Sequence, residues 1–505
     1  GYFSYVKDFK GGHNLNATAG YSYFEVNGEN FGMDNYNFSV DGIKYWDIGQ
    51  GSYLTDGKAG MSSGKSVTER LFSFFARANY SYQDKYMLSA SIRHEGSSKF
   101  AADNRWANFW SATAGWRISN EEFMKDFDWL DDLKIRFGYG VTGNNDFSAT
   151  YMANMLGSDT NWMMPNGTWA YSYGKSQNVN PNLGWEEKKE WNLGVDYSFF
   201  EGRLYGKFDY YRREVDNLLF SVKVPQPPYT QGSQMQNIGS MESKGWEFEV
   251  GGDIIRTKDF TWSSSMNLSH NTGKILTLEG DNSYHNGNGF VAPGTPGDAA
   301  RMEAGSTIGS FYMWKFAGFD DEGSFLLYNK DGEVIPAAQK TENDKQYIGN
   351  YTPKLIIGWS HTLTYKNFDL GINLRSWIDF DVYNTINMYY GIQGQGNLNV
   401  LKDAYGKFNH IKGEKLICDY FLEDGTFLKI DAITLGYTLP MKMYTNNLID
   451  RIRIYGTVGN VCTITGYSGM NPEVDITGWD KGTEKFWSDF YPVVRTWTLG
   501  MQFNF

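Results

Sequence analysis

The end of the chain alternates strictly between apolar and polar positions. Every second position there is apolar: Trp497, Leu499, Met501, Phe503 and Phe505. A period of two predicts an extended strand with one apolar face. Such a strand suits either the last strand of a packed β-sandwich or the closing strand of a membrane β-barrel. In a membrane barrel the apolar face meets lipid and ends in an aromatic girdle.

The same alternation recurs along the whole chain and predicts about fifteen strands. The clearest of them lie at 72–82, 86–93, 133–141, 191–199, 355–365 and 368–374. The polar positions of several strands carry charges, as at Lys207, Asp209, Glu247 and Glu249. Charged side chains cannot pack in the dry core of a sandwich, but they suit a water-filled lumen.

The connections between these strands alternate between tight turns and long polar stretches. Tight turns are predicted at 83–85, 201–202 and 366–367, and long irregular stretches at about 27–68, 142–187, 275–352 and 381–425. A membrane barrel has short periplasmic turns and long extracellular loops, whereas a sandwich or propeller need not keep this parity. We therefore predict an all-β fold, a transmembrane antiparallel β-barrel.

An odd strand count has a further implication. Bacterial single-chain barrels have an even number of strands, with both ends in the periplasm. Unless the count is wrong by one, earlier strands are expected on residues outside this sequence. The sequence starts Gly1-Tyr2-Phe3 without the features of a signal peptide, so we expect a processed product or a fragment.

Composition agrees with a lipid-facing barrel. Aromatic residues make up 17 % of the chain although its mean hydropathy is −0.50. A barrel needs only alternate residues to be apolar, although a secreted sugar-binding propeller also uses many aromatics. There is no apolar run of about 18 residues, the length of a transmembrane helix. The net charge of −12 argues against a nucleic-acid partner.

Motifs for catalysis or metal binding are not found in the sequence. The six histidines are scattered, and there is neither a phosphate-binding loop nor a nucleophile elbow. We therefore expect no enzyme activity and no cofactor. The acidic segments 320–323 and 330–333 could bind calcium, but their spacing favours solvated turns. Cys418 and Cys462 are expected to be small hydrophobic residues rather than a disulfide.

Several segments, in this order, resemble one known family. They are residues 73–82 (SFFARANYSY), 139–144 (YGVTGN), 180–186 (NPNLGWE), 309–312 (GSFY), 434–440 (TLGYTLP) and 467–473 (YSGMNPE). As an ordered set they are similar to the SusC/RagA-type TonB-dependent transporters of Gram-negative outer membranes. The resemblance covers essentially the whole chain.

The resemblance implies an outer-membrane barrel of about 22 strands, of which residues 1–505 would form the C-terminal part. The N-terminal plug and about seven strands would then belong to a separate segment or chain. The resemblance also implies a SusD-like surface lipoprotein as a lid, and energy coupling to TonB through the plug-bearing segment.

Aromatic residues in the long loops are the candidates for contact with substrate or lid. They are Trp162, Trp169, Tyr171 and Tyr173 in one long stretch and Trp46 in another. Sugar rings stack on such side chains, although packing between loops, or of loops on the lid, is the alternative. Trp191, Trp359 and the apolar residues of the closing strand are expected in the membrane girdle.

The predicted function is TonB-dependent import of oligosaccharides across the outer membrane. Peptide cargo is the alternative within the same architecture. A secreted sugar-binding β-protein without transport and a passive porin are the alternatives outside it.

Overall fold

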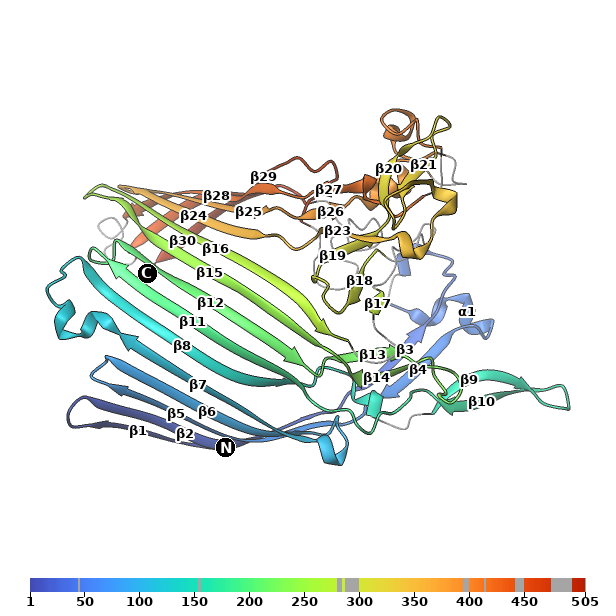
Figure 1. The fold of residues 1–505 in the computed structure, drawn as a ribbon, viewed down its shortest axis with the longest axis horizontal. Coiled ribbons are helices and arrows are strands. Elements are labelled where there is room, and N and C mark those ends of the chain that lie inside the picture. Colours follow the sequence, from blue (N-terminus) through green and yellow to red (C-terminus); the bar gives the residue numbers. More distant parts are fainter. Residues whose placement is uncertain are drawn as a thin grey trace.

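The computed structural model describes residues 1–43, 46–152, 156–278, 284–286, 299–393, 399–412, 415–440, 449–473 and 493–504. Fifteen long strands form one antiparallel sheet, in which each strand lies beside the next one along the chain (Figure 1). They are β1 (Tyr2–Phe9), β2 (His13–Val26), β5 (Glu69–Tyr82), β6 (Tyr86–Ser97), β7 (Trp106–Arg117), β8 (Leu130–Asn144), β11 (Glu186–Phe199), β12 (Leu204–Asp216), β15 (Ser240–Arg256), β16 (Phe260–Thr277), β24 (Leu355–Tyr365), β25 (Phe368–Ile378), β28 (Phe427–Pro440), β29 (Arg451–Thr465) and β30 (Thr496–Asn504). The predicted count of strands is confirmed.

The register of the sheet joins the predicted apolar faces into one continuous surface. Directly paired residues include Ala78 with Ala90, Phe137 with Leu193, Phe208 with Phe248, Leu268 with Ile357, and Val458 with Trp497. A slip of one residue at any pair would turn a whole strand over, so the shared apolar face fixes the register. Many of its large side chains are exposed, an arrangement that suits lipid rather than water.

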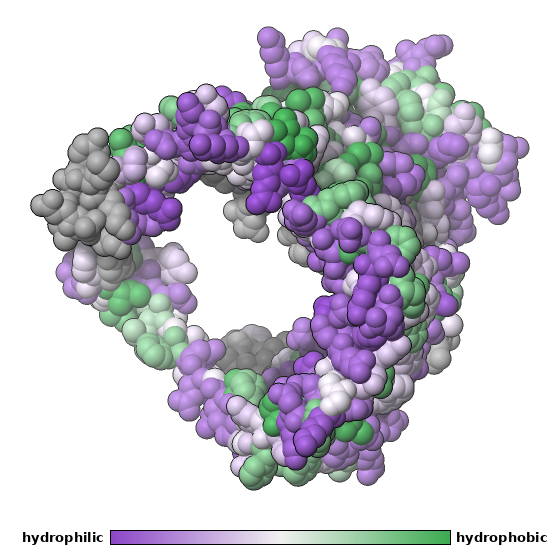
Figure 2. All heavy atoms as spheres, turned by 90° about the vertical axis from the view of Figure 1, so that its left-hand side faces the viewer, coloured by the Kyte–Doolittle hydropathy of each residue, from purple (hydrophilic) through white to green (hydrophobic). Residues whose placement is uncertain are grey.

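The sheet is curled around an open channel. Figure 2 shows this opening from the end with the short turns, with hydrophilic side chains gathered around it. The polar face of the strands is therefore the inner face. In the described part of the chain the sheet begins with β1 and ends with β30, which do not pair with each other, so the barrel is not closed.

The two ends of the sheet differ as predicted. One end has tight turns, for example at Gln83 and Asp84, whose φ angles of 50° and 53° are typical of a two-residue hairpin turn. The other end carries the long connections (right in Figure 1). Among the connections that the structure describes in full, two depart from this parity in length: the connection at 98–105 is brief, and the turn at 118–129 contains two short 3-10 helices.

The long connections are more ordered than the sequence predicts. They contain the strands β3 (Glu29–Asp34), β4 (Gly60–Lys65), β9 (Leu156–Met163), β10 (Trp169–Lys175), β13 (Leu219–Lys223), β14 (Ser233–Asn237), β17 (Tyr284–Asn286), β18 (Arg301–Glu303), β19 (Ser310–Met313), β20 (Lys315–Phe319), β21 (Phe325–Tyr328), β22 (Val334–Pro336), β23 (Gln346–Asn350), β26 (Asp381–Tyr383) and β27 (Leu422–Asp424). The helices are α1 (Ser52–Thr55) and α2 (Thr385–Tyr390), with 3-10 helices at Asp41–Ile43, Ile48–Gln50, Ala102–Asn104, Ile118–Asn120, Glu122–Met124, Ala149–Met152, Ala337–Gln339, Glu342–Asp344, Lys402–Tyr405 and Asp419–Phe421. The prediction of irregular stretches was wrong here because elements this short show no sustained period.

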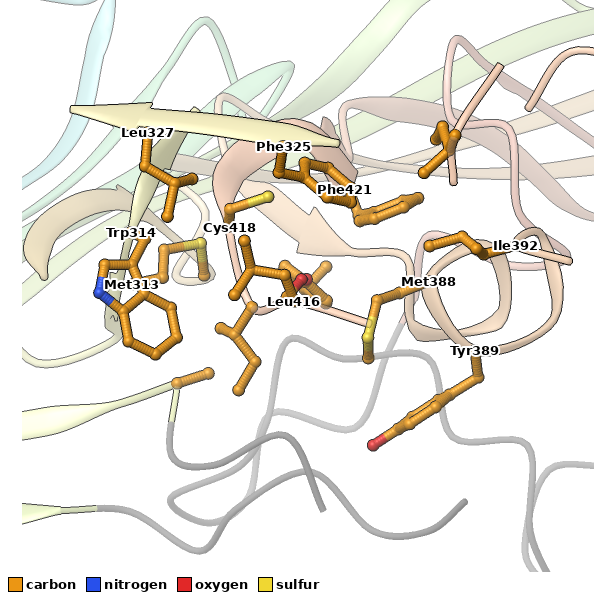
Figure 3. Close-up of a cluster of buried hydrophobic side chains, with 14 of the residues drawn as sticks. Met313, Trp314, Phe325, Leu327, Met388, Tyr389, Ile392, Leu416, Cys418 and Phe421 are labelled. Carbon is orange, nitrogen blue, oxygen red and sulfur yellow. The ribbon is translucent and has the colours of Figure 1, made fainter. Parts of the chain in front are cut away.

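Two of these connections share one hydrophobic core. The described residues of 299–354 and 379–426 together form what we call the loop subdomain. Its core contains Met313, Trp314, Phe325, Leu327, Met388, Ile392, Leu416, Cys418 and Phe421 (Figure 3). Cys418 and Cys462 are both free, as expected, and burial raises the pKa of the Cys418 thiol to about 12.

The closing strand keeps its apolar face outward. Trp497 is 76 % exposed, and Leu499, Met501 and Phe503 are exposed as well, while Phe505 lies outside the described residues. Exposure is what a membrane girdle requires, and contact of these residues with lipid stays a prediction. Among the described residues, no helix combines the length and apolar character needed to cross a bilayer.

Candidate functional site

The inner face of the sheet carries charges that are paired with one another. Arg136 on β8 donates from Nε and Nη2 to Asp196 on β11, at 2.9 and 2.8 Å, and from Nη2 to Asp209 on β12 at 3.1 Å. It passes over Gly194, where an added methyl group would lie 2.6 Å from the guanidinium. Glycine in the middle strand therefore makes room for a bridge across three strands.

The same arrangement recurs farther along the sheet, on the inner face of β25, β28 and β29. Arg453 on β29 reaches over Gly436 on β28 to Asp369 on β25, with 2.9 Å between Nε and Oδ1. Lys207 on β12 pairs with Glu249 on β15 at 3.0 Å. The predicted charged lining is confirmed, and the charges named here are paired within the wall.

A short segment after β29 folds back onto the inner face. We call residues 466–473 the strap. Its Glu473 accepts from Lys429 Nζ at 2.7 Å and pairs with Arg375 Nη1 at 2.8 Å. Asp431 completes the cluster, 3.1 Å from Arg375. The side chain of Lys429 is only 6 % exposed, so this cation depends on its partners in the protein.

The strap also holds the loop subdomain. Ser468 Oγ donates to Glu423 Oε1 at 2.7 Å and accepts from the side-chain amides of Asn384 and Asn387. Its neighbour Tyr467 is buried with Phe380, Val382 and Phe427. One segment thus joins the inner wall to the start of α2 and to β27.

One of the family motifs, residues 180–186, packs against other segments at the long-connection end of the sheet. Its Leu183 and Trp185 form a buried cluster with Phe100, Phe109 and Phe147. Trp185 Nε1 donates to the carbonyl of Arg105 at 3.0 Å, and Asn145 donates to Ser97 Oγ at 3.1 Å. These contacts fix the connections in place.

A pocket of about 330 Å³ opens beside β15 and β16, at the end of the sheet that carries the long connections. Its walls are apolar, and its rim carries Arg301, Thr307 and Ser310. We call it the mouth pocket. Sequence analysis missed it because its walls come from two separate connections and the ends of two strands, and no local signal joins them.

The predicted aromatic stretch forms a hairpin of β9 and β10 that projects at the long-connection end (Figure 1). Trp162, Trp169 and Tyr173 are 68 %, 67 % and 70 % exposed, and they share this hairpin. Tyr171 pairs through its backbone with Asn161, and its side chain lies outside the described part. Trp46 is 73 % exposed but belongs to another connection. Their contact with substrate or lid stays a prediction.

The acidic turns of the loop subdomain use their oxygens internally. Asp320 Oδ1 accepts from the backbone N–H groups of Glu322 and Ser324, at 3.0 and 2.7 Å. Among the described residues, no three His, Cys, Asp or Glu side chains lie close enough together to hold a metal ion. For these turns, solvated acidic side chains therefore stay the favoured prediction over calcium binding.

Two carboxylates of the loop subdomain have raised pKa values. Burial raises the pKa of Asp381, although it accepts from the backbone N–H of Asn350 at 2.8 Å. Burial also raises the pKa of Asp419, which accepts from the backbone N–H of Phe316 at 2.6 Å. Both carboxylates hold backbone segments in place, which is a structural role.

Residues 1–460 match the family described as "TonB dependent receptor-like, beta-barrel". The chain is 32 % identical to the TonB-dependent receptor SusC of Bacteroides thetaiotaomicron over 89 % of its own length and 45 % of the relative's. It is 30 % identical to TonB-dependent receptor P3 of Formosa agariphila over 100 % of its length and 52 % of the relative's.

The structure of the RagAB peptide transporter matches with a TM-score of 0.82 and 25 % identity, covering 99 % of this chain and 54 % of that one. The chain spans about half the length of the relatives it matches. Its apolar outer face, polar channel and ordered motifs agree with these matches. The chain belongs to the TonB-dependent receptor-like β-barrel family and is an outer-membrane barrel protein of the SusC/RagA type.

Proposed function

We propose that this protein takes part in TonB-dependent import of an oligomeric nutrient across the outer membrane. The observation that carries the proposal is the division of one sheet into an outer apolar face and an inner face of paired charges. Such a wall is stable in lipid and lets polar cargo pass through a wet lumen. The long connections at one end would receive the cargo on the extracellular side.

We further propose that residues 1–505 form the C-terminal part of one barrel of about 22 strands. The plug and about seven further strands would come from a segment outside this sequence. The proposal is supported by the chain covering about half the length of its relatives. TonB would act on the plug-bearing segment, and a SusD-like lipoprotein would cover the mouth.

Oligosaccharides are the first candidate cargo. The exposed indoles of Trp162 and Trp169 offer flat faces to the C–H faces of sugar rings. The same hairpin could instead contact the lipoprotein lid. Peptides are the second candidate, since the structurally similar RagAB is a peptide transporter.

The test is uptake by cells that carry the complete receptor and its partner, with and without TonB. We expect accumulation of either an oligosaccharide or an oligopeptide that is lost when TonB is deleted. TonB-independent uptake would indicate a passive porin. A receptor that stays soluble without detergent would indicate a secreted binding protein.

A double variant tests the hairpin in the same cells. Replacing Trp162 and Trp169 with alanine should lower affinity for the cargo or lid about 10-fold or more, because each indole supplies a large contact area. The matched control is Tyr405→Ala, a 71 % exposed aromatic residue of the loop subdomain. Equal loss in the control would remove the hairpin as a contact site.

A further inference from the structure

The mouth pocket has walls of one chemical kind. They are formed by Leu218, Phe220, Met241, Ile275, Met302 and Ile308. Aliphatic and thioether groups dominate the lining, and Phe220 and Tyr351 contribute aromatic rings. A mainly apolar lining favours an apolar side chain as the ligand group.

The pocket lies on the inner side of the sheet. Met241 is on the same face of β15 as Glu247 and Glu249, because all three are separated by even numbers of residues. Ile275 on β16 pairs with Met241. Cargo that moves from the long-connection end toward the channel would thus pass this pocket.

Backbone hydrogen bonds hold the walls in place. Ile275 donates to the carbonyl of Ser306 at 3.0 Å and accepts from Gly305 at 2.8 Å, while Ile308 donates to Gly273 at 2.9 Å. An added methyl group at Gly273 would lie 2.9 Å from the side chain of Ile308, so this glycine permits close contact. The pocket is therefore preformed, as binding pockets usually are.

The rim adds a positioned cation. Arg301 Nη1 donates to the hydroxyl of Tyr312 at 2.9 Å, and the guanidinium lies 4.1 Å from the centre of that ring. Thr307 and Ser310 line the same pocket. A cation and hydroxyls beside an apolar hollow suit a peptide, whose backbone carbonyls and terminal carboxylate flank its side chains.

We infer that the mouth pocket binds one apolar side chain, of the size of leucine, methionine or phenylalanine, from an oligopeptide cargo. This inference rests on the proposed import function and selects peptides, the second of its two candidate cargoes. Burial of such a side chain should favour a leucine peptide over its alanine analogue by about 10- to 100-fold in affinity.

The experiment uses the complete receptor with its partner in detergent and fluorescent oligopeptides that differ at one position. We expect leucine and phenylalanine peptides to bind about 10- to 100-fold more tightly than alanine or aspartate analogues. Met302→Trp, which narrows the pocket, should weaken this preference. Met61→Trp is the matched control, since Met61 is 85 % exposed on β4 and should leave the preference unchanged.

A second measurement covers the case in which Met302→Trp does not fold. A peptide with a photoreactive leucine is crosslinked to the unchanged receptor, and the crosslinked residues are mapped by mass spectrometry. Crosslinks at 218–220, 241, 275 or 300–310 support the inference. Equal affinities across the peptide series, or crosslinks only elsewhere, overturn it.

The two proposals fail in different ways. TonB-dependent uptake of oligosaccharides with no side-chain preference for peptides would overturn the mouth pocket and leave the import function intact. Selective peptide binding without TonB-dependent uptake would overturn the import function and leave the mouth pocket intact.

Discussion

Replacing Glu473 with glutamine removes the anion that holds the strap on the inner wall. Lys429 Nζ lies 2.7 Å from one oxygen of Glu473, and Arg375 lies 2.8 Å from the other. The two side chains of the closer pair are 6 % and 12 % exposed, so water replaces little of the lost interaction. Breaking a buried ion pair on one side costs about 3–5 kcal/mol.

Asp431 reduces the expected loss of stability but does not cancel it. It stays 3.8 Å from Lys429 and 3.1 Å from Arg375, and it is 32 % exposed. We therefore expect Glu473→Gln to lower the free energy of unfolding by about 2–4 kcal/mol. Urea unfolding of the complete receptor in detergent, followed by heat-modifiable migration on gels, measures the change.

Two further variants test the reasoning. Glu29→Gln removes a carboxylate that is 78 % exposed and 3.7 Å from Lys65, so it should change stability by less than about 0.5 kcal/mol. The double variant Glu473→Gln with Lys429→Met should be more stable than Glu473→Gln alone, because no buried cation is left unpaired. Equal losses for Glu473→Gln and Glu29→Gln would refute the account of the strap.

Three other changes have defined outcomes. Gly194→Ala should lower the free energy of unfolding by about 1–3 kcal/mol, because the new methyl group displaces the guanidinium of Arg136. Gly371→Ala is the control: no atom lies within 4 Å of the added group, so the loss measured by urea unfolding should be less than about 0.5 kcal/mol. Burial raises the pKa of Asp381, so this carboxyl binds its proton more tightly in the folded state than in the unfolded state. Its contribution to stability therefore falls as the pH rises through the pH range in which it titrates. Asp381→Asn should stabilise the protein more at pH 7 than at pH 4, and the opposite order in urea unfolding would contradict this. The Cys418 thiol, with a pKa of about 12, should resist alkylation at about pH 8 until the loop subdomain unfolds, and rapid labelling by mass spectrometry would argue against its burial.

The strands could be predicted because a period of two is a strong local signal. Trp497 and Leu499 show the apolar face without any knowledge of their neighbours, and each further strand repeats the pattern. The same signal also gave the charged inner face, as at Asp209 and Glu249. The pattern could not predict which charges form ion pairs, because only the sheet register brings Arg136 and Asp209 together.

The long connections and the mouth pocket could not be predicted in this way. Ile275, Met302 and Leu218 meet in space but share no periodic pattern. Glu473 belongs to a motif recognised from the sequence, yet its partner Lys429 lies 44 residues away. The motif indicated that this segment matters, and only the structure explains that it fastens the loop subdomain to the inner wall.

The ion pairs that pass over Gly194 and Gly436 have a consequence for transit. Because the guanidinium groups of Arg136 and Arg453 are matched by carboxylates of adjacent strands, these two parts of the lining carry little net charge. Under the proposed import function, solutes of either charge would pass these two places without being retained. Selection would then fall to the entrance, where binding should respond more to ionic strength than passage beside these pairs.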